Sequence, residues 1–296
     1  MLDSAIAYDL NPCLITFVQI NACLYVMSKQ TEILPADPMP AERQRFILER
    51  LSSDGRVLAA DIARALGASE DTIRRDLREM AGRGVLKRVY GGALPVSPAS
   101  GSFEVRQQQN VDGKQALARL AATLAAPGQL LFLDAGSTNL AIAEALPENL
   151  DLTVATNAPA IAMALMGRPG ISVILIGGAI DAHVGGSVGA KAVRDVELLR
   201  VDLCFLGTCA LDEASGASVF SFEDAEFKRA LVRISRSIAI VATTEKLGTA
   251  ARYPVLDVDH LHHLVVDRDA PVAHCAAFVR AGVTLHQLPE ERQSIA

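Results

Sequence analysis

Seven short apolar runs recur between residues 130 and 288 and constrain the fold more than any other feature of the chain. They are "LLFLD" (130–134), "LTVAT" (152–156), "ISVILIGG" (171–178), "DLCFLG" (202–207), "SIAIVAT" (237–243), "HLVVD" (263–267) and "VTLHQL" (283–288). Several runs are continuous rather than alternating in polarity, which is typical of strands covered on both faces. The first two are followed by helical stretches ending near Leu146 and Met166. Because such alternation builds βαβ units, we expect an α/β domain with a mostly parallel sheet flanked by helices.

A module of opposite charge precedes these runs. Residues 41–95 contain eleven lysines and arginines against eight acidic residues, a net charge of +3 in a chain whose net charge is -6. The segment holds three helical patterns, with a tight turn at Gly67 between the second and the third. The stretch "VLKRVYGGAL" follows as a predicted hairpin, with Gly91 and Gly92 near its turn or its far end. This order predicts a small winged helix-turn-helix domain.

The third helical pattern, "GASEDTIRRDLREMAGRG", carries four arginines among four acidic residues. We expect this helix to begin at Ser69, a favourable N-cap residue, and to end near Arg83. At about 100° per residue, the apolar side chains form one stripe and three of the arginines lie roughly opposite. The expected buried stripe is Ile73, Leu77 and Met80, and the opposite arginines are Arg74, Arg75 and Arg78.

Two interpretations of this charged face compete. In isolation it would be a solvated surface, held by pairs such as Asp71–Arg75 and Arg75–Glu79 that contribute about 0.2–0.5 kcal/mol each. As the third helix of a basic winged module it would instead enter the major groove, where arginine donors meet guanine edges while hairpin side chains contact phosphates. We favour DNA binding. The predicted DNA-binding residues are Ser69, Thr72, Arg74, Arg75, Arg78, Lys87, Arg88 and Tyr90.

The segment "GRVLAADIARALGASEDTIRRDLREMAGRGVLKRVYGGAL" resembles the N-terminal module of the DeoR family of bacterial transcription regulators. The match lies in the core Ser69-x-x-Thr72-Ile73-Arg74-Arg75-Asp76-Leu77 and in the ending Gly91-Gly92-Ala93. The resemblance continues to about residue 288. It implies a sensor domain related in fold to sugar-phosphate isomerases, which binds a phosphorylated sugar or related anionic metabolite without converting it. The expected function is therefore a DNA-binding transcriptional regulator, a repressor of a carbohydrate-metabolism operon.

The motifs behind the second half of the resemblance lie mostly at strand ends. They include "FLDAGST", "VATN", "ILIGG", "VDLCFLG" and "FEDAEFK". They imply the effector-binding residues Asp134, Gly136, Ser137, Thr138, Thr156, Asn157, Gly177, Gly178, Asp202, Glu223 and Lys228. We add Lys246, because Lys228 and Lys246 would both supply positive charge to an anion site.

The residues themselves support such a site. A strand ends at Asp134, and a Gly-Ser-Thr turn then opens a helix. Backbone N–H groups and two hydroxyls at a helix N-terminus favour anions, and ligands of open α/β sheets bind beyond the carboxyl ends of the strands. An isolated turn of this kind is more often a simple N-cap, but the series of polar residues at neighbouring strand ends favours a binding site.

Three positions depart from the family pattern. Where the family usually has D-S-S-K-[FL]-G, the chain has "TTEKLG", with Thr243 in place of the aspartate and Glu245 in place of the second serine. Gly113 replaces the usual glutamate before Lys114. If this late loop touches the effector, its chemistry differs here.

The main alternative is an enzyme, a sugar-phosphate isomerase with a DNA-binding tether. It would need a carboxylate base beside the bound sugar, for which Glu223 and Asp202 are the candidates. We predict no catalytic residue, cofactor or metal. The expected partners are double-stranded operator DNA, a small-molecule effector and further copies of the chain, as a dimer or tetramer.

The predicted organisation has four parts. They are an extension (1–38) that could be a start-site artefact, the winged domain (39–95), a linker (96–111) and the sensor domain (112–296). The five cysteines form no CxxC pair, which favours a reducing cytoplasm. The longest early apolar run is too short to span a bilayer, so we expect a cytoplasmic protein with no membrane association.

Overall fold

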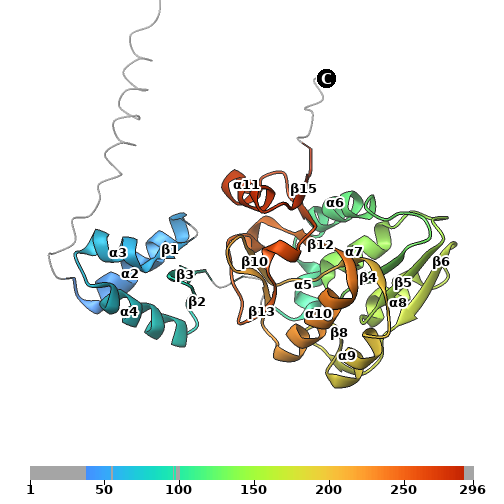
Figure 1. The fold of residues 1–296 in the computed structure, drawn as a ribbon, viewed down its shortest axis with the longest axis horizontal. Helices are drawn as coiled ribbons and strands as arrows, with labels where there is room; N and C mark the ends of the chain where they lie inside the picture. Colours follow the sequence, from blue (N-terminus) through green and yellow to red (C-terminus); the bar gives the residue numbers. More distant parts are fainter. Residues whose placement is uncertain (1–37, 55, 96, 98–100, 290–296) are drawn as a thin grey trace, which may run out of the picture.

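The computed structural model describes residues 38–289 apart from residues 55, 96 and 98–100. Within these residues the chain forms a small N-terminal module and a larger α/β module (Figure 1). The predicted extension falls almost entirely outside the described residues. Among the described helices, none is both long enough and apolar enough to cross a bilayer.

The small module is a winged helix-turn-helix, as predicted. Its elements are α2 (Pro40–Asp54), β1 (Val57–Leu58), α3 (Ala59–Leu66), α4 (Glu70–Gly82), β2 (Lys87–Val89) and β3 (Gly92–Leu94). The three strands form one antiparallel sheet in the order β1-β3-β2. The predicted hairpin is therefore the pair β2–β3, and its turn lies at Tyr90 and Gly91.

Two glycines shape this module. Gly67 ends α3 in the left-handed region, with φ of 63°, where a glycine is at no steric disadvantage. A Cβ atom on Gly92 would lie 1.9 Å from the carbonyl oxygen of Val57, so only glycine allows β3 to pair with β1 so closely. The tight turn and the attached wing therefore follow from glycines at fixed places.

The core of the α/β module is a seven-stranded sheet in which every neighbouring pair is parallel. The strand order is β15-β14-β12-β9-β4-β5-β6. The strands are β4 (Leu130–Leu133), β5 (Leu152–Thr156), β6 (Ile171–Leu175), β9 (Val201–Phe205), β12 (Ser235–Ala242), β14 (His263–Val266) and β15 (Thr284–Gln287). These are the seven apolar runs of the sequence, which confirms the predicted α/β fold.

Helices cover both faces of this sheet, and alternate strand residues supply two separate cores. One core joins α6 (Val111–Ala122), α7 (Ser137–Ala145) and α8 (Pro159–Leu165) to strand residues such as Leu131 and Phe205. The other joins α9 (Ala190–Val196), α10 (Phe222–Ile234) and α11 (Val272–Arg280) to residues such as Phe132 and Cys204. Burial on both faces explains why the apolar runs are continuous.

Shorter strands that the sequence pattern did not predict extend the module. The strands β10 (Ala210–Asp212), β11 (Gly216–Val219) and β13 (Tyr253–Leu256) form an antiparallel sheet, and β7 (Ala179–Asp181) pairs with β8 (Gly186–Val188). Helix α5 (Phe103–Gln108) lies within the segment that we assigned to the linker. Ser102 caps it by accepting a hydrogen bond from the backbone N–H of Val105.

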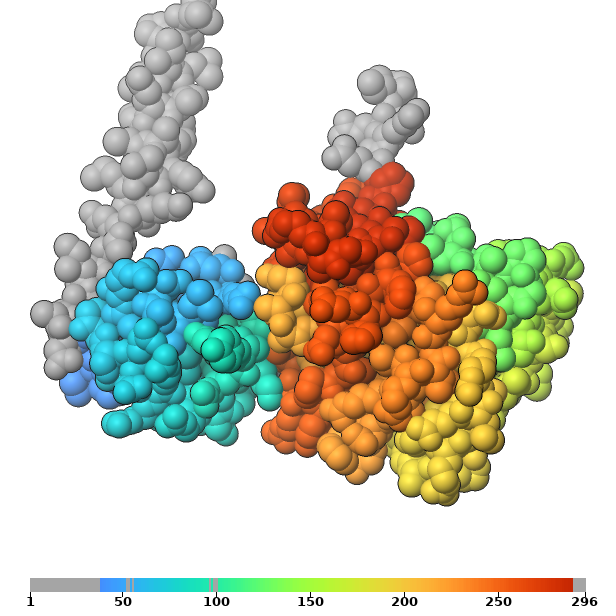
Figure 2. All heavy atoms as spheres, in the orientation of Figure 1, coloured from blue at the N-terminus to red at the C-terminus, as the bar shows by residue number. Residues whose placement is uncertain are grey.

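The two modules touch along the β10–β11 hairpin and the residues before β13 (Figure 2). Ser97 of the connecting segment donates a hydrogen bond to the carbonyl of Cys209, and the N–H of Ala250 donates to the carbonyl of Pro95 at 3.3 Å. Arg56 lies 3.8 Å from Glu213, whose other carboxylate oxygen lies 2.8 Å from His274. The wing is therefore held beside the part of the α/β module that follows β9.

Candidate functional site

Helix α4 presents a polar outer face with an ordered start. Ser69 accepts a hydrogen bond from the backbone N–H of Thr72 at 3.1 Å, which confirms the predicted N-cap. The stripe of Ile73, Leu77 and Met80 is buried, as expected. Three of the helix's arginines are exposed on the remaining surface: Arg74, Arg75 and Arg78.

The ion pairs along α4 differ from those that we expected. Arg74, not Arg75, is the paired arginine, and it contacts Glu70 and lies 3.4 Å from Asp71. Among the described residues, Arg75 and Arg78 have no ion-pair partner. The pairs Asp71–Arg75 and Arg75–Glu79 are not formed, so two arginine head groups remain available to another molecule.

Asp76 has a structural role that the angular argument missed. It is buried and accepts two hydrogen bonds from Arg43 of α2, at 2.6 and 3.1 Å. The sequence pattern of this helix could not show that α2 supplies a cation to Asp76. This bidentate pair fixes the orientation of α4 against α2.

The residues of the wing that were predicted to contact phosphates lie in two different environments. Arg88 and Tyr90 are exposed and available to DNA. Lys87 faces the α/β module instead, where its ammonium group lies 3.4 Å from the carbonyl oxygen of Arg252. Burial, reinforced by the nearby Arg252 charge, lowers the pKa of Lys87.

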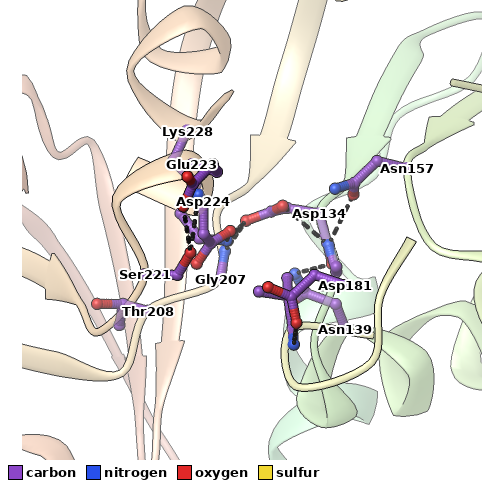
Figure 3. Close-up of polar contacts among 12 residues, drawn as sticks. Asp134, Asn139, Asn157, Asp181, Gly207, Thr208, Ser221, Glu223, Asp224 and Lys228 are labelled. Atoms are coloured by element: carbon purple, nitrogen blue, oxygen red, sulfur yellow. Dashed lines mark hydrogen bonds and ion pairs between the residues drawn. The ribbon is translucent and has the colours of Figure 1, made fainter. Parts of the chain in front are cut away.

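The larger module contains a cavity beyond the carboxyl ends of β4, β9 and β12, which we call the first cavity. It lies between the N-terminal turn of α7, the loop after β9 and the start of α10 (Figure 3). Five of the predicted effector residues line it: Gly136, Ser137, Thr138, Lys228 and Lys246. The position is the one expected for ligands of open α/β sheets.

A buried ionic cluster forms one wall of the first cavity. The ammonium group of Lys228 pairs with Asp134 and lies 3.2 Å from Asp224, four residues earlier on α10. Although burial alone would lower the pKa of Lys228, the two carboxylates raise it. Burial raises the pKa of Asp224 to about 6 against the opposing effect of Lys228. The charge of Lys228 is thus largely neutralised within the protein.

Asp134 also holds the backbone that surrounds the cavity. Its carboxylate accepts hydrogen bonds from the N–H groups of Ala135 and Gly207, both at 2.8 Å. The side chain of Asn139 ties the same region together by donating to the carbonyls of Asp134 and Phe205. These bonds fix the Gly-Ser-Thr turn of α7 against the loop that follows β9.

A second cavity adjoins the first and shares Arg106, Ser137 and Lys246 with it. The other residues that line it are Gln109, Lys114, Thr243 and Glu245. Burial and the neighbouring charge of Lys246 lower the pKa of Lys114 to about 8, and burial also lowers the pKa of Lys246. Three cations therefore face a region whose lining contains one carboxylate, that of Glu245. An anion in this region would be stabilised by them.

Several predicted effector residues do not line either cavity. Thr156 and Asn157 are fully buried and bond to backbone instead, with Asn157 accepting from Ala135 and donating to Ser187. Asp202 lies at the amino end of β9, the opposite end of the sheet, where it accepts a hydrogen bond from the N–H of Leu130. The remaining members of this group are Asp134, Gly177, Gly178 and Glu223.

Two of the three departures from the family pattern, Thr243 and Glu245, line the second cavity, and the third, Gly113, precedes a lining residue. The hydroxyl of Thr243 donates a hydrogen bond to a carboxylate oxygen of Glu245 at 2.7 Å. A carboxylate is thus present in this loop although Thr243 has replaced the usual aspartate. Gly113 lies one residue before Lys114 on α6, and a Cβ atom there would meet the side chain of Asn110 at 2.4 Å.

Sequence reasoning missed several residues that line the first cavity. Arg106, Thr208, Cys209, Ser221 and Asp224 all do so. The spacing of Asp224 and Lys228, four residues apart on a helix, was the available signal for that pair. Arg106 was hidden because its segment was assigned to the linker.

A winged helix-turn-helix with free arginines on its third helix, joined to an α/β module with a cation-lined cavity, defines the class of DNA-binding transcriptional regulators. Comparison with known families agrees. The model of the DeoR-like helix-turn-helix domain matches residues 43–99, and that of the DeoR C terminal sensor domain matches residues 109–268. The chain belongs to the DeoR family.

Named relatives span nearly the same length. The chain is 34% identical over 250 residues to the HTH-type transcriptional regulator GlpR of Haloferax volcanii, covering 83% of this chain and 97% of that one. It is 29% identical to the glycerol-3-phosphate regulon repressor of Escherichia coli, covering 78% and 92%. It is also 29% identical to the HTH-type transcriptional repressor GlcR of Bacillus subtilis, covering 82% and 95%. The protein is therefore a transcriptional regulator rather than an isomerase with a DNA-binding tether.

Proposed function

We propose that this regulator represses a carbohydrate-metabolism operon and that a phosphorylated sugar, or a related anionic metabolite, releases it from its operator. The relatives named as repressors support the direction of control, and one of them is named for glycerol 3-phosphate. The regulator binds DNA as a homo-oligomer, so that two copies of α4 contact successive half-sites.

The observation that carries the effector proposal is the cation cluster of the second cavity. Arg106, Lys114 and Lys246 gather opposite the N-terminal turn of α7, where Ser137 offers a hydroxyl and backbone N–H groups. Lys228 contributes little to an anion site, because Asp134 and Asp224 already neutralise it. The phosphate group is therefore assigned to Arg106, Lys114, Lys246 and Ser137.

The same residues provide a route to the DNA-binding module. Lys246 donates a hydrogen bond to the carbonyl of Thr208 at 3.0 Å, and the next residue, Cys209, accepts from Ser97 of the connecting segment. A phosphate that draws Lys246 toward itself weakens its hydrogen bond to Thr208 and so changes how the loop after β9 is held. The effector shifts the equilibrium only if it binds the DNA-free arrangement more tightly.

A thermal-shift screen tests this proposal, because a ligand stabilises the state that binds it. The panel contains glycerol 3-phosphate, pentose and hexose phosphates, their unphosphorylated parents and inorganic phosphate. We expect at least one phosphorylated compound to raise the melting temperature and also to release a fluorescent operator duplex selected from a random pool. Stabilisation by the unphosphorylated sugars alone would contradict the assignment.

A further inference from the structure

Two carboxylates surround one ammonium group in the wall of the first cavity. Figure 3 shows Asp134 and Asp224 on either side of Lys228, close to Ser221 and Gly207. All three ionisable side chains are at least nine-tenths buried. Counting only these described groups, the cluster carries one more negative than positive charge, which is costly in a buried site unless a further donor is supplied.

The two carboxylates are not equally satisfied. Asp134 accepts from the N–H groups of Ala135 and Gly207 as well as from Lys228. Asp224 lies 3.2 Å from the Lys228 ammonium group through its Oδ1 atom, and among the described residues no other group donates to this buried oxygen. Asp224 is thus the carboxylate of the cluster that retains unused acceptor capacity.

The hydroxyl groups beside Asp224 already have partners in the protein. Thr208 donates to the carbonyls of Ala210 and Ser218. Ser221 caps α10, accepting from the N–H of Asp224 while lying 3.4 Å from Glu223. Neither hydroxyl is directed to Asp224 as a donor, so these two side chains do not supply the donor that Asp224 lacks.

We infer that Asp224 accepts a hydrogen bond from a hydroxyl group of the effector. It thereby selects a phosphorylated compound whose hydroxyl reaches Asp224 when its phosphate is bound in the second cavity. This inference rests on the proposed function, because it orients the same effector across the two connected cavities. The phosphate lies at Arg106, Lys114 and Lys246, and the hydroxyl-bearing end lies at Asp224. The raised pKa of Asp224 agrees with a carboxylate short of donors.

The test compares Asp224→Asn with Glu226→Gln, a control on an exposed carboxylate two residues along the same helix. Isothermal titration calorimetry measures the affinity of each full-length variant for inorganic phosphate, for the tightest-binding sugar phosphate of the screen and for its monodeoxy analogues. We expect Asp224→Asn to weaken binding of the sugar phosphate by about tenfold to a hundredfold, which is the range for a lost hydrogen bond to a charged group. Inorganic phosphate affinity stays within about twofold of the wild type in Glu226→Gln, and it is not weakened in Asp224→Asn, because the substitution leaves Lys228 with one neutralising carboxylate instead of two.

The deoxy analogues separate recognition from a general loss of structure. In the wild type and in Glu226→Gln, one monodeoxy analogue binds more weakly than its parent. In Asp224→Asn, parent and analogue bind alike. Undiminished discrimination in Asp224→Asn overturns this inference alone. If no sugar phosphate binds the wild type more tightly than inorganic phosphate does, the proposed function and the inference both fall.

Discussion

At the scale of single residues, the contrast between neighbouring arginines on α4 is the most informative feature. Arg74 is held by Glu70 and Asp71, whereas Arg75 and Arg78 are exposed without an ion-pair partner among the described residues. An arginine with no competing carboxylate loses less on transfer to a base edge or phosphate. The structure therefore ranks the three predicted DNA contacts, with Arg75 and Arg78 ahead of Arg74.

This ranking gives the first prediction. Arg75→Ala should weaken binding to the selected operator by about 1–3 kcal/mol if its guanidinium contacts a base, and should relax preference at one position. Fluorescence anisotropy on the operator and on single-base variants measures both effects. Arg64→Ala, on the exposed surface of α3, serves as the charge-matched control. Equal losses on every duplex would assign Arg75 to a phosphate instead.

The turn of α7 gives the second prediction. Ser137→Ala combined with Thr138→Val should remove operator release by the effector while leaving operator affinity within about twofold, because these residues line the first cavity and lie far from α4 in sequence. Thr138 is buried, so valine is used to preserve its volume. A double variant that still responds fully to the effector would remove this turn from the binding site.

At the scale of secondary-structure elements, α2 and α4 are joined by a polar contact through an otherwise apolar core. The Arg43–Asp76 pair lies beside Ile47, Ile73 and Leu77, all of which are buried. A buried bidentate pair specifies one relative orientation of two helices, whereas apolar packing alone tolerates several.

The third prediction follows from this contact. Asp76→Ala should destabilise the winged module by about 3–5 kcal/mol, because it leaves the guanidinium of Arg43 without its carboxylate in a buried position. Chemical denaturation followed by circular dichroism measures the loss. Asp71→Ala, which removes an exposed carboxylate of the same helix, should change the stability by less than about 0.5 kcal/mol. Comparable losses of stability from the two substitutions would mean that the buried pair does not stabilise the winged module.

The elements also show what sequence could and could not predict. All seven strands of the parallel sheet were predicted, because strands buried on both faces leave continuous apolar runs in the sequence. The sheet of β10, β11 and β13 was missed, since β10 and β11 are joined by a short turn rather than by a helix and so do not follow the strand–helix alternation of the predicted runs. Asp202 was predicted to bind the effector but lies at the amino end of β9: the motif "VDLCFLG" suggested a site but not which of its residues faces it. Arg106 was missed because its segment, which forms the six-residue helix α5, was assigned to the linker.

At the scale of the whole molecule, a chain of charges connects the two modules. His274 of α11 contacts Glu213, and Glu213 in turn lies 3.8 Å from Arg56 of the winged module. The hydrogen bond that His274 donates to Glu213 raises the pKa of His274 above its ordinary value, and the same bond lowers the pKa of Glu213 to about 2. Protonation of His274 thus strengthens its contact with Glu213.

The fourth prediction concerns pH. Because the folded-state pKa of His274 is raised, its contribution to stability is fully present below the unfolded value, near 6.5, and is lost as pH rises through the folded value. His274→Gln should therefore lower the melting temperature more at pH 6 than at pH 8. The corresponding loss in the free energy of unfolding is at most about 1 kcal/mol. His260→Gln, at an exposed position, provides the control. A deficit that grows with pH would reverse the assigned sign.

The hydrogen bond from Ser97 to the carbonyl of Cys209 joins the effector cavity to the segment that leads from the wing, so it can couple effector binding to DNA binding. Cys209 lines the first cavity, while Ser97 lies three residues beyond the wing strand β3. Two binding sites joined through one loop obey thermodynamic reciprocity, so the factor by which effector weakens DNA binding equals the factor by which DNA weakens effector binding. We expect Ser97→Ala to shrink both factors equally, which calorimetry with and without operator duplex can measure. If the effector weakens DNA binding as proposed, the regulator on its operator binds the effector less tightly than the free protein does, and its response begins in the unbound pool.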